Sequence, residues 1–118
     1  MELKKILAYA VKNGASDVHL TVGSPPAVRV DGAIRFVGDT ILGAKETMGY
    51  LDVIMNEEQR NRFLRTGDAD LAYSVQGLGR FRVNILRQRG SVGIIMRHVR
   101  GKILSFEQLN LPPALAKI

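Results

Sequence analysis

The sequence predicts an α+β domain built on an antiparallel sheet. A length of 118 residues is that of one domain, and a composition of 46% hydrophobic and 24% charged residues is typical of a globular protein. Segments in which apolar and polar residues alternate follow one another through short turns. Strands joined in this way pair antiparallel, because a parallel pair needs a long crossover between its strands.

The first third of the chain predicts a helix, a strand and a hairpin. Residues 2–13 carry apolar side chains at helical spacing, namely Leu3, Ile6, Leu7 and Ala10. Residues 17–22 alternate as a half-buried strand does, and His19 on its polar side is expected to be a structural residue with satisfied hydrogen bonds. In residues 27–36, Asp31-Gly32 between two β-forming runs is typical of a type I′ turn.

The middle of the chain predicts two helices. Apolar residues at helical spacing indicate the first of them over residues 45–55. Asn56, with a glutamine three positions later, resembles a capping box and predicts the start of the second helix. We expect Phe63 and Leu64 to point inward and Gly67 to end this helix.

The final third predicts a meander of three strands: 71–75, 80–87 and 92–99. A short helical turn is expected at residues 105–109, and Pro112-Pro113 predicts a stiff linker. We therefore place one domain over residues 1–109 and the start of a linker over residues 110–118. A linker that leads to no further domain predicts that the chain is a piece of a longer protein.

The sequence argues against a catalytic or metal centre within these residues. It has no cysteine, its two histidines lie far apart, and no phosphate loop of the form G-x-x-x-x-G-K-[ST] occurs. Asp68 and Asp70 are expected to be a polar strand edge rather than an acid–base pair. With no uninterrupted run of about 18 apolar residues, we expect no membrane-spanning helix and a cytoplasmic location.

Positive charge is concentrated at the end of the chain. Residues 1–79 hold nine Lys/Arg and ten Asp/Glu, whereas residues 80–118 hold eight Lys/Arg and one acid, Glu107. The stretch 80–100 contains six arginines and no carboxylate. Such asymmetry is typical of a protein with an anionic partner: nucleic acid, phosphate or an acidic protein surface.

The hairpin in this basic stretch can be given a register. A two-residue loop at 89–90 and a four-residue loop at 88–91 both pair residues whose numbers sum to 179, and only a three-residue loop would shift the pairing. In this register Arg82 lies opposite Arg97 on one face, and Phe81 belongs to the apolar face. Like charges opposite each other repel, so the arrangement is favourable when an anion lies between them.

Two interpretations of these arginines remain. One is a solvated basic face, which is the commoner use of such residues. The other is an anion site at Arg82 and Arg97, with Arg80, Arg87 and Arg89 as a secondary basic surface, and the lack of a nearby acid favours it. The second interpretation requires both guanidinium groups to point outward, on the same side of the sheet and without a carboxylate partner.

A basic module that binds nucleic acid or an acidic protein surface is the alternative function. Proteins that bind single strands interleave basic residues with exposed aromatic rings. Here Phe81 lies on the apolar face and the basic hairpin has no other aromatic residue. We therefore rank nucleotide phosphate above nucleic acid as the partner.

Five segments resemble the N-terminal domain of type IV pilus retraction ATPases, the PilT-type members of the secretion ATPase superfamily. They are Ala15-Ser16-Asp17-Val18-His19-Leu20, Pro25-Pro26 with Arg29-Val30-Asp31-Gly32, Arg80-Phe81-Arg82-Val83-Asn84, Arg87-Gln88-Arg89-Gly90, and residues 106–112. Their order and spacing are those of the family, and the resemblance covers essentially the whole chain.

The resemblance implies a PAS-like fold and a role within a larger motor. It implies a homo-hexamer in which a RecA-like motor domain follows the linker and holds ATP, magnesium and the catalytic carboxylates, so that this chain alone is not an enzyme. It further implies that Arg82 and Arg97 approach the nucleotide phosphates when the two domains close, which would couple hydrolysis to domain rotation.

The same resemblance implies partners and a location in the cytoplasm, peripheral at the inner membrane through the pilus machinery. The partners are the motor domains of its own and neighbouring subunits and the platform protein of the pilus machinery in the inner membrane, with no nucleic acid among them. The chain begins where retraction-type members begin, which favours pilus retraction and twitching motility over assembly. Small-molecule sensing would follow from a PAS-like fold alone and is the weakest alternative.

Overall fold

The structure, a computed structural model, describes residues 2–88 and 91–99. The helices are α1 (Leu3–Lys12), α2 (Ala44–Ile54) and α3 (Glu57–Thr66). The strands are β1 (Asp17–Thr21), β2 (Ala27–Val30), β3 (Ala33–Phe36), β4 (Asp68–Val75), β5 (Gly79–Gln88) and β6 (Ser91–Val99). The predicted elements up to residue 99 are therefore present, whereas the expected helical turn at 105–109 and the domain boundary after 109 lie outside the described residues.

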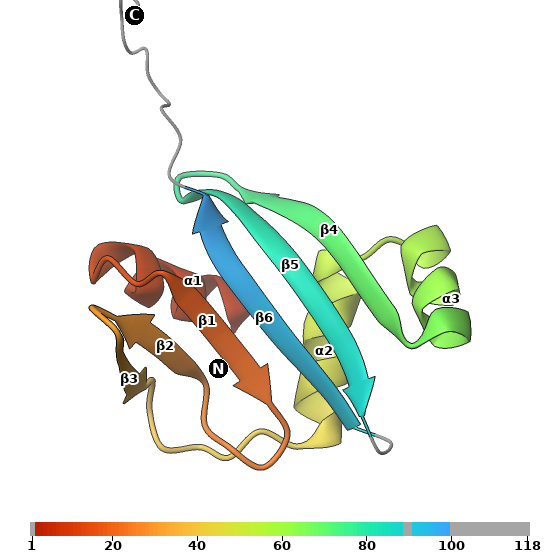
Figure 1. Cartoon of the computed structure of the whole chain (residues 1–118), viewed down its shortest axis with the longest axis horizontal. Helices are drawn as coiled ribbons and strands as arrows, with labels where there is room; N and C mark the ends of the chain where they lie inside the picture. Colours follow the sequence, from red (N-terminus) through yellow and green to blue (C-terminus); the bar gives the residue numbers. More distant parts are fainter. Residues whose placement is uncertain (1, 89–90, 100–118) are drawn as a thin grey trace, which may run out of the picture.

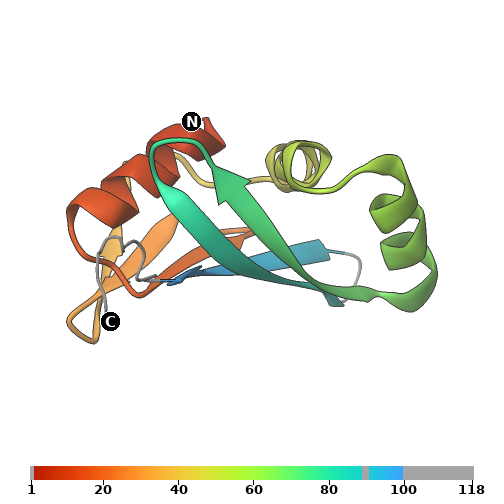
Figure 2. The same cartoon turned by 90° about the horizontal axis from the view of Figure 1, so that it is seen from above.

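The six strands form one antiparallel sheet in the order β3-β2-β1-β6-β5-β4 (Figure 1). It consists of two three-stranded meanders, one from each half of the chain, that meet where β1 pairs with β6. The three helices lie on one side of the sheet (Figure 2). The α+β class with helices on one face is thus confirmed, and the other face of the sheet carries no helix among the described residues.

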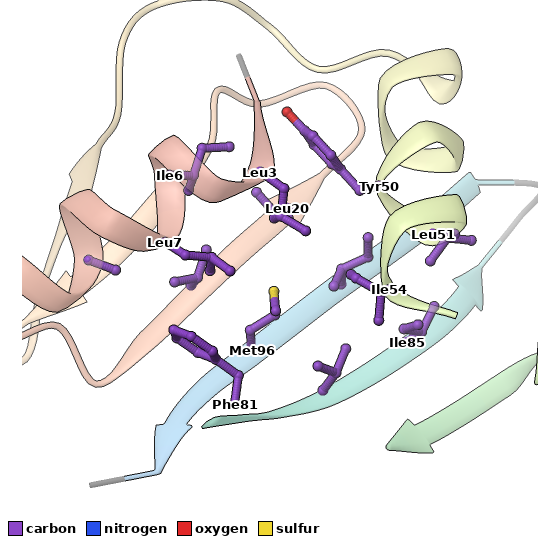
Figure 3. Close-up of a cluster of buried hydrophobic side chains, with 14 of the residues drawn as sticks. Leu3, Ile6, Leu7, Leu20, Tyr50, Leu51, Ile54, Phe81, Ile85 and Met96 are labelled. Carbon is purple, nitrogen blue, oxygen red and sulfur yellow. The ribbon is translucent and has the colours of Figure 1, made fainter. Parts of the chain in front are cut away.

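The core lies between the helices and the sheet (Figure 3). The stripe of α1 that the sequence predicts is buried, and so is the inward face of β5 and β6, where Phe81, Ile85 and Met96 have no exposed surface. Alternation explains this face, because successive side chains of a strand point to opposite sides of the sheet. The helix-covered side is therefore apolar, and the polar residues of the same strands face outward.

The turn and the helix ends predicted from short sequence motifs are present in the structure. Asp31 and Gly32 have φ angles of 50° and 81°, as a type I′ turn requires. Asn56 accepts a hydrogen bond from the backbone N–H of Gln59, whose side chain accepts one from the backbone N–H of Asn56. Gly67 ends α3 with a φ of 85°, in the left-handed region that favours glycine.

One expectation within α3 is wrong. Phe63 is buried, but Leu64 is 47% exposed. Consecutive residues of a helix are rotated by about 100° relative to each other, so a helix that contacts the domain through one narrow face buries only one of the two. Helix α3 lies at the edge of the domain beside β4, and Phe63 is its one buried residue.

Candidate anion site on the open face of the sheet

The register predicted for the last hairpin is confirmed. Gln88 pairs with Ser91, Phe81 with His98 and Arg82 with Arg97 along β5 and β6. Phe81 points into the core, so Arg82 and Arg97 stand opposite each other on the open face. The side chain of Arg82 is 68% exposed and that of Arg97 is 73% exposed.

A row of charged residues crosses the open face of the sheet. Arg29 of β2 pairs with Asp17 of β1, Asp17 pairs with Arg97, and Arg97 pairs with Arg82. Asp70 of β4 lies diagonally across from Arg82, because its own pairing partner on β5 is Asn84. From β2 to β4 the order of charges is positive, negative, positive, positive, negative. The two neighbouring positive charges are Arg97 and Arg82.

The expectation that no acid lies near the two arginines is wrong. Arg82 Nη2 is 3.4 Å from Asp70 Oδ2, and Arg97 Nε is 3.3 Å from Asp17 Oδ1. The guanidinium groups meet the requirement of a shared outward face, but each has a carboxylate partner. Asp17 and Asp70 were missed because they precede the basic stretch by 63 and 10 residues (80 minus 17 and 80 minus 70), and only strand pairing brings them close.

The structure therefore does not meet the requirement that neither arginine has a carboxylate partner, and an anion would have to displace Asp17 and Asp70. Exposed ion pairs contribute only about 0–1 kcal/mol, because water screens them and long side chains lose freedom in them. Both contacts join single atoms at more than 3 Å, so neither guanidinium uses the two-pronged geometry that gives the strongest pairs with oxyanions. A phosphate, which offers several oxygens, can therefore exchange with the carboxylates.

A shallow hollow of about 230 Å³ lies between the two arginines. It is lined by Asp70, Arg82, Val83, Asn84, Ile95 and Arg97. Two guanidinium groups and the amide of Asn84 can serve an oxyanion there, and the carboxylate of Asp70 at the same hollow opposes it.

The other predicted basic residues do not join this hollow as a group. Arg80 lies on the open face two residues from Arg82 along β5, opposite Val99. Arg87 contacts the other side of the domain: its Nη2 donates a hydrogen bond to the carbonyl oxygen of Leu64 at 3.2 Å, and its guanidinium lies 5.8 Å from the centre of the Phe63 ring. Arg87 therefore stabilises the end of α3 and is not part of a secondary basic surface with Arg80. Arg89 lies outside the described residues.

His19 differs from its expected role. Its Nε2 atom is buried and has no hydrogen-bond partner among the described residues, so it is not a satisfied structural histidine. It lines a second hollow of about 150 Å³, next to the first, together with Thr21, Asn84, Leu86, Gly93, Ile94 and Ile95. The two hollows share Asn84 and Ile95, so a polar atom lies unpaired beside the arginine pair.

A larger hollow of about 390 Å³ lies on the helix side, between α1, α2 and β4. Leu3, Tyr50, Val53 and Tyr73 give it a largely apolar lining. Burial, and to a lesser extent the negative charge of Glu46, raises the pKa of Tyr50 above its ordinary value of 10.0. The charged groups of the open face are not part of this hollow.

Within residues 2–88 and 91–99, the structure brings no three His, Asp or Glu side chains together in a way that could hold a metal ion. Over the same residues, each helix is too short or too polar to cross a bilayer. Among the described residues, the arginine pair with its hollow is therefore the best candidate for a binding site.

Two curated proteins are similar in sequence over the whole of this chain. The type IV pilus ATPase PilU of Pseudomonas aeruginosa is 37% identical over 118 residues, which cover the whole chain and 31% of PilU. The type IV pilus retraction ATPase PilT of the same organism is 35% identical over the whole chain and 34% of PilT. No family model matches the chain.

A solved structure agrees with these relatives. The crystal structure of the pilus retraction motor PilT with bound ADP matches 95% of this chain and 33% of its own, with 37% identity and a TM-score of 0.79. The chain therefore spans about a third of the length of the relatives that it matches. The resemblance on which the sequence analysis rests is confirmed over the whole chain.

Proposed function

We propose a function for a chain that corresponds to the N-terminal domain of a PilT-type ATPase: it presents Arg82 and Arg97 to the phosphates of a nucleotide held by a motor domain. The match to the pilus ATPases PilT and PilU over the whole chain supports a role as a motor-associated domain. The observation that supports the finer role is the exposed arginine pair above its hollow, on the face that no described helix covers.

The chemistry of this role is electrostatic. A phosphoryl group in transfer carries negative charge on several oxygens, and guanidinium groups aimed at those oxygens stabilise it. An arginine pair on a separate domain reaches them only when the domains close, which would link hydrolysis to movement. In this proposal ATP, magnesium and the hydrolytic residues belong to a motor domain outside these 118 residues, and the full protein works as a homo-hexamer that retracts pili.

The first test is the gene. We expect a phosphate-loop sequence within about 200 codons after residue 118, since the motif G-x-x-x-x-G-K-[ST] marks the motor domain that the proposal requires. A stop codon there, with no such motif elsewhere in the gene, would contradict the proposal.

The second test is ATP turnover by the full-length protein. Arg82→Ala and Arg97→Ala are each expected to lower kcat by at least about tenfold, a conservative figure for arginines that stabilise a transferring phosphoryl group. Arg35→Ala on β3 is the matched control, because it removes the same charge from an exposed position away from the hollow. Equal turnover in all three variants would rule out the arginine role.

The alternative, a basic module for nucleic acid or an acidic protein surface, gains no support from the open face. Asp17 and Asp70 are partners of these arginines in both roles, so the ion pairs do not decide between them, and the lack of any aromatic residue besides Phe81 in the basic hairpin disfavours stacking with single-stranded bases. Binding of single-stranded DNA that weakens steeply with salt would favour this alternative over the nucleotide role.

A further inference from the structure

The two arginines of the hollow contact their carboxylate partners through different nitrogen atoms. Asp17 contacts Arg97 through Nε, the nitrogen nearest the aliphatic chain. Asp70 contacts Arg82 through Nη2, one of the two terminal nitrogens. A guanidinium binds oxyanions best with two parallel N–H groups along one edge. The contact with Asp17 thus does not involve the terminal nitrogens of Arg97, whereas the contact with Asp70 occupies one of those of Arg82.

The two carboxylates also differ in how firmly they are held. The side chain of Asp17 is 14% exposed, and that of Asp70 is 61% exposed. Asp17 has further partners: Arg29 Nε lies 3.4 Å from its Oδ2, and the hydroxyl of Ser16 donates to the same oxygen at 3.3 Å. Asp17 is thus a carboxylate held in the sheet between two cations, whereas Asp70 is an exposed carboxylate whose ion-pair partner is Arg82.

We propose that Asp17 is a positioning residue and Asp70 a competing one. Asp17 holds Arg97 by Nε so that its terminal nitrogens face the hollow before an anion arrives. Asp70 occupies Nη2 of Arg82 until the anion displaces it. An oxyanion with two or more phosphate groups would then bind first at Arg97 and recruit Arg82 second. The inference rests on the proposed function, since it takes the ligand to be a polyphosphate.

Simple electrostatics makes a different prediction, which allows a test. If the aspartates only lower the local positive potential, removing either charge should strengthen anion binding by the same factor. The proposal instead expects opposite effects from the two sites. Asp68 is the matched control: it lies on β4 two residues from Asp70, on the same open face, is exposed, and contacts neither arginine.

The experiment is a titration of the chain with inorganic pyrophosphate, followed by NMR at the backbone amides and at the arginine Nε–H groups. Asp70→Asn is expected to bind about two- to fivefold more tightly than Asp68→Asn, which corresponds to the loss of one exposed ion pair. Asp17→Asn is expected to bind at least about twofold more weakly than Asp68→Asn, although it removes the same charge.

The Nε–H signal of Arg97 gives a readout that a change in fold stability would not produce. In the unliganded chain, we expect this signal to shift in Asp17→Asn and to stay in place in Asp70→Asn, because only Asp17 accepts a hydrogen bond from that group. Backbone spectra with native dispersion serve as the check that each variant is folded. If Asp17→Asn unfolds, Asp70→Asn still provides a test, because the Asp70 side chain is exposed.

The outcomes separate the inference from the proposed function. Equal affinities for Asp70→Asn and Asp68→Asn would overturn the competing role, and an affinity of Asp17→Asn equal to or above that of Asp68→Asn would overturn the positioning role. Arg82→Ala and Arg97→Ala are tested in the same way. If these two variants bind pyrophosphate as the wild type does, or if the wild type shows no binding at millimolar concentrations, the proposed anion site itself fails.

Discussion

The two faces of this sheet are made by the same strands and follow different rules. On the covered face, β5 and β6 contribute apolar side chains that have no exposed surface and pack under the helices. On the open face, the same strands contribute Arg82 and Arg97, which are exposed and paired with carboxylates from β4 and β1. Substitutions on the covered face should therefore alter stability, and substitutions on the open face should alter binding.

The largest expected effect concerns Phe81 on the covered face. Phe81→Ala should lower the free energy of unfolding by about 3–5 kcal/mol, because it removes a fully buried ring and leaves a cavity. Urea denaturation measures the change. Leu86→Ala, on the open face of the same strand, is the control and should cost less than about 1 kcal/mol, since much of that side chain is already exposed. If both variants lost a similar free energy of unfolding, the two faces would not differ in their contribution to stability.

The next effect concerns Arg87, which lies on the covered side of β5. Arg87→Ala should lower the free energy of unfolding by about 1 kcal/mol, because Arg87 binds a carbonyl oxygen at the end of α3 and lies over the Phe63 ring. Its affinity for pyrophosphate should equal that of the wild type. Thermal unfolding and the titration described above measure the two quantities, and a clear loss of affinity would place Arg87 in the anion site after all.

A third effect is confined to alkaline pH and comes from Tyr50 on the helix side. Burial and Glu46 raise the pKa of Tyr50 above 10.0 in the folded state, so the folded state favours the neutral phenol. This contribution is complete below pH 10 and is lost as the pH rises through the folded-state value. Urea midpoints should fall more steeply above pH 10 for the wild type than for Tyr50→Phe. Identical slopes would contradict the assignment.

The smallest effect on stability belongs to the candidate site. Arg82→Ala and Arg97→Ala should each change the free energy of unfolding by less than about 0.5 kcal/mol, because exposed ion pairs contribute little. Their circular dichroism melts should overlay that of the wild type while their affinity for pyrophosphate falls. A loss of several degrees in Tm would show that these side chains support the fold and would weaken their assignment to binding.

The difference between the faces also explains what the sequence could predict. Alternation identifies the buried side of each strand, so the core residues of β5 and β6 and the outward direction of Arg82 and Arg97 follow from local spacing. Gln88 and Ser91 are close in sequence and pair with each other, so the register of the last hairpin, and with it the pairing of Arg82 with Arg97, could be predicted.

The partners of the arginines depend on pairings of longer range. Asp70 could have been found, because Val75 pairs with Gly79 across a short turn, and the same register extended along β4 places Asp70 opposite Asn84, diagonal to Arg82. Asp17 could not, since β1 and β6 are far apart in sequence and no turn fixes their register. Arg87 was misassigned although alternation places it on the same side of β5 as the buried Phe81 and Ile85; what alternation does not show is that α3 ends beside it.

The central pairing of β1 with β6 has a consequence for how the chain folds. Each three-stranded half closes through contacts between neighbours in sequence, but Asp17 and Arg97 are 80 residues apart, and contacts of such separation form slowly. The pairing of β1 with β6 therefore completes both the sheet and the charged row. A ligand of the hollow would contact β4, β5 and β6 only, so it would stabilise the second half directly and would reach β1 only through the ion pair of Asp17 with Arg97.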